Sequence, residues 1–215
     1  MKHDRSNRIR ELIGQRTVLP VLVIDDAAKA VPLARALADG GLKLIEITLR
    51  TPAALSAIAA IAEALPGIEV GAGTVCDASD ARHAQKAGAR FAVSPGHATN
   101  LGKACAELGL PYLPGVATAS EVMAARNDGY DVMKFFPAEA AGGLAMLAAL
   151  AGPFPDVMFC PTGGIDAANA PAYLARSNVL CVGGSWIAPR DEVTAGHWAK
   201  LTGLAAAAAR LQRGG

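Results

Sequence analysis

Residues 18–41, VLPVLVIDDAAKAVPLARALADGG, contain one complete unit of the pattern that organises this chain. The continuous apolar run over residues 18–24 predicts a strand buried on both faces, and Asp25-Asp26 ends it. Residues 27–37 have a helical composition, and Gly40-Gly41 closes that segment. The unit therefore predicts a buried strand followed by a helix.

The same unit recurs along the whole chain at intervals of roughly 20–25 residues. Strict alternation implies parallel strands joined by right-handed crossovers. Eight units in 215 residues predict an α/β protein, a single (β/α)8 TIM barrel over residues 1–215 with an N-terminal helix near residues 5–15. A doubly wound open sheet is the alternative, but its glycine-rich first turn is absent after Ile24. The predicted strands lie near residues 18–24, 43–50, 68–75, 90–95, 111–117, 131–137, 157–163 and 179–186, and the predicted helices near 27–37, 52–64, 78–87, 98–108, 119–128, 142–151, 166–175 and 195–212.

Composition narrows the class of protein. Hydrophobic residues make up 52% of the chain and charged residues 18%, which is normal for a parallel sheet covered by helices. The net charge is +1, and the scattered lysines and arginines form no basic patch for nucleic acid or for a membrane surface. The start MKHDRSNRIR is polar, unlike the apolar core that we would expect of a signal sequence, and no apolar run approaches the roughly 20 residues that span a bilayer. We therefore expect a soluble, cytoplasmic protein with no nucleic-acid or membrane partner.

The second predicted strand, Leu44-Ile-Glu-Ile-Thr-Leu-Arg50, carries polar side chains on one face. Side chains alternate along a strand, so the two isoleucines meet the helices while Glu46, Thr48 and Arg50 point into the interior. Such a face favours a proton-transfer carboxylate and an arginine that grips a substrate carboxylate or phosphate. A buried salt bridge between Glu46 and Arg50 is the structural alternative.

The sixth predicted strand, Asp131-Val-Met-Lys-Phe-Phe-Pro137, has a lysine in its middle and Phe136 on the same side. Burying an ammonium group is costly unless it is paired or neutral. Desolvation drives a lysine towards its neutral amine, which is a nucleophile. Lys134 is therefore a candidate covalent centre. A side chain that reaches solvent from an edge strand, or a structural ion pair, is the alternative.

Glycines and turn residues follow the C-terminal ends of the third to fifth predicted strands, where barrel enzymes hold their active sites. Gly71-Ala-Gly-Thr74 is no dinucleotide fingerprint, because Cys76 stands where a third glycine would be required. Its glycines allow something to approach the wall closely, and Thr74 either offers a hydroxyl group or caps the following turn. Ser94-Pro-Gly96 and residues 114–118 predict turns that shape an apolar pocket floor.

Paired glycines end the seventh and eighth predicted strands, in Pro161-Thr-Gly-Gly-Ile165 and Val182-Gly-Gly-Ser-Trp186. They expose backbone N–H groups beside a serine hydroxyl group, which together make an anion site. The loops after strands seven and eight are the usual phosphate-binding place in barrel enzymes. One glycine pair alone predicts a tight turn, whereas two at neighbouring strands favour phosphate binding.

The cysteines and histidines favour neither a disulfide framework nor a metal site. The four cysteines are far apart, and Cys160 and Cys181 fall in apolar runs where buried thiols are common. The four histidines form no metal-ligand spacing. We expect free thiols in a reducing compartment and no metal ion.

Six stretches of this sequence together resemble the bacterial 2-keto-3-deoxy-6-phosphogluconate (KDPG) and 4-hydroxy-2-oxoglutarate (KHG) aldolases, in order and over nearly the whole chain. The resemblance implies a class I, metal-independent aldolase without a cofactor, typically a homotrimer. Its expected reaction cleaves KDPG to pyruvate and D-glyceraldehyde 3-phosphate in the Entner-Doudoroff pathway, and the related activity cleaves KHG to pyruvate and glyoxylate. The stretches are Glu46-Ile-Thr-Leu-Arg50, Gly71-Ala-Gly-Thr74, Ser94-Pro-Gly96, Lys134-Phe-Phe-Pro-Ala-Glu139, Pro161-Thr-Gly-Gly-Ile165 and Gly183-Gly-Ser-Trp186.

The same resemblance implies a role for each matching residue. By it, Lys134 is the Schiff-base lysine and Glu46 the general acid and base. The residues that match substrate-binding positions are Arg50 and Thr74 for the pyruvate carboxylate, Pro95 and Phe136 for the apolar wall, Thr162 for substrate orientation, and Gly163, Gly164, Gly184 and Ser185 for the phosphate.

Two other functions fit parts of the pattern. A phosphate-binding isomerase, epimerase or decarboxylase would share the glycine loops without needing Lys134 as a covalent centre. A sensor of phosphorylated ligands has no need for Glu46 and Lys134 together in the interior. Within the aldolases, the 6-phosphogalactonate epimer is a competing substrate.

Overall fold

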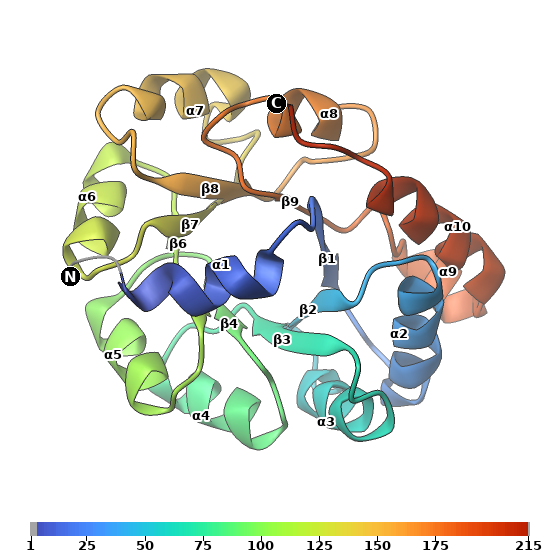
Figure 1. Cartoon of the computed structure of the whole chain (residues 1–215). Helices are drawn as coiled ribbons and strands as arrows, with labels where there is room; N and C mark the ends of the chain where they lie inside the picture. The colour runs from blue at the N-terminus through green and yellow to red at the C-terminus, as the bar shows by residue number, and fades with distance from the viewer. Residues whose placement is uncertain (1–3, 215) are drawn as a thin grey trace.

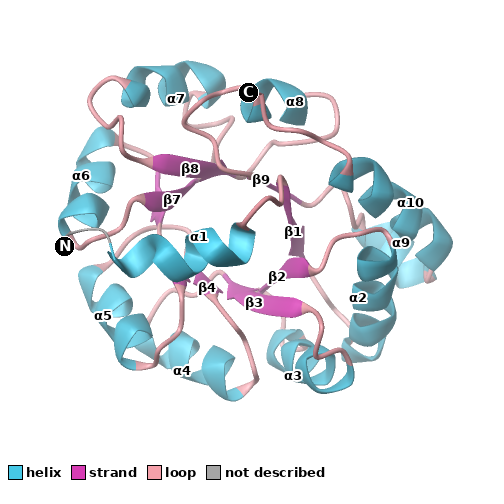
Figure 2. Cartoon of the chain, in the orientation of Figure 1, coloured by secondary structure: helices cyan, strands magenta, loops and turns pink. Residues whose placement is uncertain are grey.

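A computed structural model of the chain describes residues 4–214. Strands gather at the centre and helices surround them, with α1 lying across one end of the strands (Figures 1 and 2). The strands are β1 Val18–Leu22, β2 Leu44–Thr48, β3 Glu69–Gly73, β4 Ala92–Val93, β5 Tyr112–Leu113, β6 Gly115–Val116, β7 Val132–Phe135, β8 Met158–Pro161 and β9 Val182–Gly184. The helices are η1 Asp4–Ser6, α1 Asn7–Ile13, η2 Ala27–Lys29, α2 Ala30–Asp39, α3 Ala54–Ala64, α4 Ala78–Lys86, α5 Thr99–Glu107, α6 Ala119–Asn127, α7 Gly143–Ala151, α8 Ala170–Leu174, α9 Arg190–Ala195 and α10 Trp198–Ala209.

The strands form two parallel sheets that curl around the centre of the molecule. One has six strands in the order β5-β4-β3-β2-β1-β9, and the other has three in the order β6-β7-β8. Single parallel bridges, Phe159 with Val179 and Thr162 with Gly183, join β8 to the segment that contains β9. The predicted α/β fold with parallel strands is therefore confirmed.

The predicted strand over residues 111–117 is divided in two. Tyr112–Leu113 pairs with β4, whereas Gly115–Val116 pairs with β7, and Pro114 lies between them. Proline has no N–H to donate to a strand ladder, which accounts for the break. Each of the other predicted strands contains an observed strand, and each predicted helix overlaps an observed helix.

Helix α9 was not predicted. The sequence led us to expect one terminal helix near residues 195–212, but α10 begins at Trp198 and the six-residue α9 precedes it. Gly196 ends α9 with a backbone φ of +74°, a conformation that glycine adopts without strain. So short a segment has too few turns to show a helical period in the sequence.

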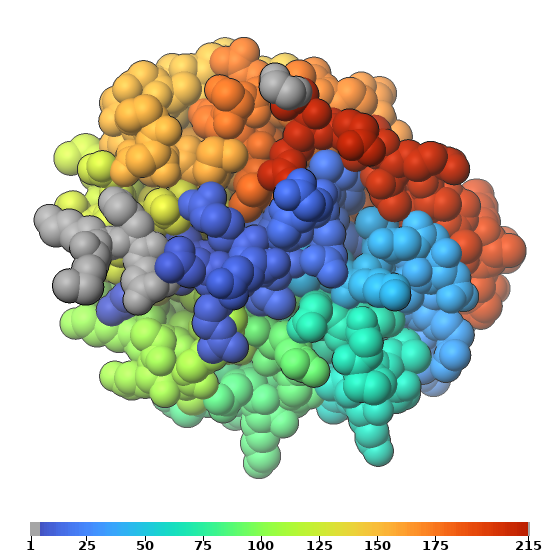
Figure 3. Space-filling view, viewed as in Figure 1, coloured from blue at the N-terminus to red at the C-terminus, as the bar shows by residue number. Residues whose placement is uncertain are grey.

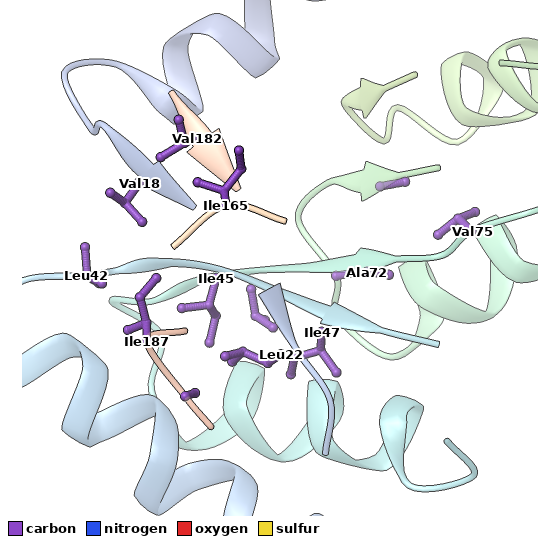
Figure 4. Packing of buried hydrophobic residues seen from close by; sticks show 14 of the residues in the cluster. Val18, Leu22, Leu42, Ile45, Ile47, Ala72, Val75, Ile165, Val182 and Ile187 are labelled. Carbon is purple, nitrogen blue, oxygen red and sulfur yellow. The ribbon is translucent and has the colours of Figure 1, made fainter. Parts of the chain in front are cut away.

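The apolar core has two layers, as the alternation of side chains along β2 predicts. Ile45 and Ile47 belong to an outer cluster between the strands and the helices, part of which Figure 4 shows. Leu44 belongs to an inner cluster, enclosed by the curled sheets. The isoleucines therefore point to the helices, and the alternate residues of β2 point inward.

Helix α1 closes one end of the inner layer. Its Ile9 and Ile13 pack in the inner cluster, and the hydroxyl oxygen of Ser6 accepts hydrogen bonds from the backbone N–H groups of Asp131 and Val132 at the start of β7. Figure 3 shows this N-terminal segment across the face of the molecule. Because α1 covers the end at which the strands begin, the polar residues at the strands' C-terminal ends lie at the opposite end.

None of the helices within residues 4–214 is both long enough and apolar enough to cross a bilayer.

Candidate active site

Lys134 of β7 and Glu46 of β2 meet inside the curled sheets. Lys134 Nζ donates a hydrogen bond to Glu46 Oε1 at 3.2 Å. The two residues are only 5% and 1% exposed, so both charges are withdrawn from water. Lys134 does not reach solvent, and Glu46 pairs with Lys134 rather than with Arg50. The remaining structural alternative, an ion pair, does hold Lys134. A desolvated amine lies within reach of a carboxylate.

Glu46 keeps one oxygen available for another proton. Within residues 4–214, the buried Oε2 atom of Glu46 has no hydrogen-bond partner, whereas Oε1 accepts from Lys134. A buried carboxylate oxygen without a donor is costly and is uncommon in native structures. This oxygen is therefore a suitable acceptor for a hydroxyl group or water brought in with a ligand.

The glycines of β3 make room for this arrangement. A Cβ atom at Gly73 would lie 2.0 Å from Glu46 Oε1, and one at Gly71 would lie 2.4 Å from the ring of Phe91. Only residues without a side chain fit at these two points. The close approach predicted from the sequence is therefore confirmed, and the approaching groups are the Glu46 carboxylate and an aromatic ring.

The amine has an aromatic neighbour. The Phe136 ring centroid lies 5.2 Å from Lys134 Nζ, within the range of a cation–π contact. Pro95 is one strand away: its carbonyl oxygen would lie 2.3 Å from a Cβ atom at Gly115, which is the register partner of Lys134. Of the two predicted wall residues, Phe136 thus lies close to the amine, and Pro95 lies close to β6, the strand that pairs with β7.

Arg50 stands at the C-terminal end of β2 and is exposed. Its Nε–H donates to the Thr48 hydroxyl oxygen at 3.2 Å, and that hydroxyl group donates to the Leu22 carbonyl oxygen at 3.0 Å. Thr48 therefore orients the arginine and ties it to β1. The sequence placed Thr48 on the inward face but did not reveal this positioning role.

Thr74 follows β3 with a backbone φ of 57°, in the left-handed region. Such a conformation is rare for a β-branched residue and strained, and strained residues cluster at functional sites. The alternative that Thr74 caps the following turn is wrong. Asp77 caps α4 instead, because its carboxylate accepts from the backbone N–H groups of Ser79 and Asp80.

The two glycine loops lie side by side at the ends of β8 and β9. The bridge between Thr162 and Gly183 joins them, and a Cβ atom at Gly183 would lie 2.2 Å from the Thr162 hydroxyl oxygen. Gly163 and Gly164 have φ values of +99° and +79°, which other residues rarely adopt. Beside them, Gly184 is buried and Ser185 is exposed. The structure thus brings the predicted anion-binding segments together at one end of the strands.

Residues 9–204 match the family model described as KDPG and KHG aldolase. The chain belongs to this aldolase family. A 2-dehydro-3-deoxy-phosphogluconate aldolase of Pseudoalteromonas atlantica is 49% identical over 91% of this chain and 91% of its own. The KHG/KDPG aldolase of Escherichia coli K12 is also 49% identical, over 87% of this chain and 88% of its own.

Solved aldolase structures share the fold of this aldolase. The KDPG aldolase of Zymomonas mobilis ZM4, solved with 3-phosphoglycerate, is 47% identical and aligns with a TM-score of 0.90 over 97% of this chain and 98% of its own. The KDPG aldolase of Legionella pneumophila, 44% identical over 92% of this chain and 96% of its own, also aligns with a TM-score of 0.90. That structure holds pyruvate captured as a covalent carbinolamine intermediate. The family predicted from the sequence is confirmed.

The aldolase also holds two thiols beside the lysine strand. Cys160 is the register partner of Lys134 on β8, and the Cys181 Sγ atom lies 3.1 Å from the Cys160 Sγ atom. Both cysteines are free and buried, as predicted. A hydrogen bond from the Cys181 thiol to Cys160, together with burial, raises the pKa of the Cys181 thiol well above its usual value. The Cys181 thiol therefore stays protonated at neutral pH. No group of three or more His, Cys, Asp or Glu side chains in residues 4–214 is placed to hold a metal ion.

Replacing Lys134 by methionine should destabilise the aldolase. We expect Lys134→Met to lower the free energy of unfolding by about 3–5 kcal/mol at pH 8, because the buried Glu46 carboxylate then lacks its cation. The double variant Lys134→Met/Glu46→Gln removes both charges and should regain most of that loss. Urea denaturation followed by circular dichroism measures both. A single variant that is as stable as the double variant would contradict the pairing.

Proposed function

We propose that this aldolase is a class I, metal-independent lyase that cleaves KDPG to pyruvate and D-glyceraldehyde 3-phosphate. The observation that carries the proposal is the contact between Lys134 Nζ and Glu46 Oε1 in the buried interior. A lysine amine beside a carboxylate supplies the nucleophile and the acid–base group of imine chemistry. The names of the relatives, among them the KDPG aldolase of Pseudomonas aeruginosa at 47% identity, support the substrate.

The architecture that we propose is one closed (β/α)8 barrel, built by residues 1–215 as a single domain. A one-residue break at Pro114 separates β5 from β6, and a parallel bridge joins the end of β8 to β9. When β5 and β6 are counted as one strand, the barrel has eight strands. In such barrels the active site lies at the C-terminal ends of the strands, where the glycine loops and Arg50 lie.

The reaction begins at Lys134. Lys134 first passes a proton from its ammonium group to Glu46, and the resulting neutral amine attacks the C2 ketone carbon of KDPG. Glu46 returns the proton to the C2 hydroxyl group of the adduct, which leaves as water, and a protonated imine remains. The positive nitrogen then draws the electron pair of the C3–C4 bond, so that the bond breaks and an enamine remains. The imine itself is the electron sink, and the cleavage needs no metal ion.

Glu46 moves the protons. Its carboxylate, through a water molecule, takes the proton of the C4 hydroxyl group as the C3–C4 bond breaks, and glyceraldehyde 3-phosphate leaves. Glu46 then returns a proton to C3 of the enamine, which gives the pyruvate imine. Hydrolysis of that imine releases pyruvate and the free Lys134. The unpartnered Oε2 atom supports this role, because it can accept a proton without breaking the contact to the lysine.

The remaining residues bind and orient the substrate. We propose that Arg50, held by Thr48, grips the C1 carboxylate together with the Thr74 hydroxyl group. Pro95 and Phe136 form the apolar wall beside the imine, and Thr162 orients the substrate. The glycine loops bind the distant phosphate, so binding energy far from C3–C4 fixes the bond that breaks. The residues of the phosphate site are Gly163, Gly164, Gly184 and Ser185.

KHG is the second substrate that we propose. The Escherichia coli relative is named KHG/KDPG aldolase, which supports both activities. The same imine chemistry on KHG releases glyoxylate in place of glyceraldehyde 3-phosphate. We further propose that the enzyme acts in the Entner-Doudoroff pathway.

We propose a cytoplasmic homotrimer as the working form. The free thiols of Cys160 and Cys181, 3.1 Å apart, support a reducing compartment. The trimer rests on the family resemblance, and it implies a particle three times the mass of the 21.9 kDa chain.

Lys134→Arg should abolish cleavage without unfolding the enzyme. Arginine keeps a cation beside Glu46, but its guanidinium stays protonated and forms no imine. We expect no pyruvate release from KDPG above background, measured by coupling to lactate dehydrogenase. Lys103→Arg, at an exposed position on α5, is the matched control and should keep the wild-type rate. Turnover by Lys134→Arg at the wild-type rate would rule out the imine and favour an isomerase-like or sensor function.

Glu46→Gln should slow proton transfer while leaving the amine in place. We expect the exchange of the pyruvate methyl protons with deuterium oxide to fall by about 10²–10⁴-fold, the usual contribution of general acid–base catalysis. Proton NMR of pyruvate with the enzyme measures this half-reaction alone. An exchange rate equal to the wild-type rate would assign the proton transfer to another group.

A further inference from the structure

A second carboxylate, that of Glu139, lies against the proposed phosphate loop. The Glu139 backbone N–H donates to the Gly163 carbonyl oxygen at 3.1 Å. A Cβ atom at Gly164 would lie 2.5 Å from Glu139 Cγ, so the aliphatic part of the Glu139 side chain packs directly against Gly164. Gly164 is held from another side by Asn169, whose amide donates to the Gly164 carbonyl oxygen at 2.9 Å. The loop is thus packed directly against an acidic side chain.

This placement opposes phosphate binding unless the carboxylate is turned away. Like charges at such short range repel, and the repulsion grows where protein displaces water. Glu139 is exposed and sits on the loop after β7, so its side chain has the freedom to swing towards an anion-binding loop or away from it. Phosphate binding therefore requires another group that fixes the direction of the Glu139 carboxylate.

Tyr173 of α8 supplies that restraint. Its side chain is fully buried, and its hydroxyl group donates a hydrogen bond to Glu139 Oε1. A Cβ atom at Gly143 would lie 3.0 Å from the Tyr173 hydroxyl oxygen and 3.5 Å from Glu139 Oε1. The bond therefore lies against the first residue of α7, where a helix N-terminus favours a negative charge. Burial and the Glu139 carboxylate both raise the pKa of Tyr173, so its hydroxyl group stays a donor at every working pH.

We propose that Tyr173 is a positioning residue that holds the Glu139 carboxylate towards α7 and away from the substrate's phosphate. It thereby sets the preference of the enzyme for phosphorylated over unphosphorylated substrates. The inference rests on the proposed function, because it needs a phosphate at the glycine loops. It assigns Tyr173 no contact with the substrate.

The test is Tyr173→Phe, measured on KDPG and on unphosphorylated 2-keto-3-deoxygluconate. These substrates differ only in the phosphate. For KDPG we expect KM to rise on the order of tenfold, which corresponds to about 1.4 kcal/mol, with kcat within about twofold of wild type. For the unphosphorylated substrate, kcat/KM should stay within about twofold of wild type. Tyr130→Phe is the matched control, because Tyr130 is another buried tyrosine whose hydroxyl group donates to a carbonyl oxygen, that of Gly102.

A second variant separates charge from packing. In the Tyr173→Phe background, Glu139→Gln removes the negative charge and should bring KM for KDPG back towards the wild-type value. An equal loss on both substrates, or a raised KM that Glu139→Gln does not lower, would show a structural role and overturn the proposal. An unchanged KM for KDPG would overturn it as well. Failure of the wild-type enzyme to cleave KDPG would instead overturn the proposed function, so the two failures are distinguishable.

Discussion

The buried ion pair between Lys134 and Glu46 is the constraint on which the rest of the structure depends. Withdrawing two charges from water is costly, and only a short, well-directed contact offsets the cost. The contact of 3.2 Å requires β7 and β2 to face each other across an enclosed interior. It also requires Gly73, since any side chain there would occupy the position of the Glu46 carboxylate. The curled sheets are thus shaped around a pair of charges as much as around an apolar core.

The two ends of the interior serve different purposes. At the end covered by α1, Ile9 and Ile13 fill the space between the strands with apolar side chains. Towards the other end, the inner residues become polar or lack side chains, as in the step from Leu44 to Glu46 along β2. Towards the polar end an amine and a carboxylate meet, and an arginine follows β2.

The sequence predicted the features of the fold and of the site that follow from the periodicity of its apolar residues. The alternation along its strand placed Glu46 on the inward face, whereas the sequence left open whether Lys134 points inward, and the structure shows that the two meet. The sequence did not predict contacts that depend on local geometry. Pro114 divides a strand that reads as continuous, the short α9 shows no period, and Asp77 rather than Thr74 caps α4. The bond between Tyr173 and Glu139 joins residues 34 positions apart, and no local pattern marks it.

Reduction with borohydride in the presence of pyruvate tests most directly whether Lys134 forms a covalent imine. Intact-mass and peptide analysis of the wild-type protein should find one stable pyruvate-derived adduct on each chain, at Lys134. Lys134→Arg treated in parallel should carry none. An unlabelled, folded wild-type enzyme, or an adduct at another lysine, would contradict the account.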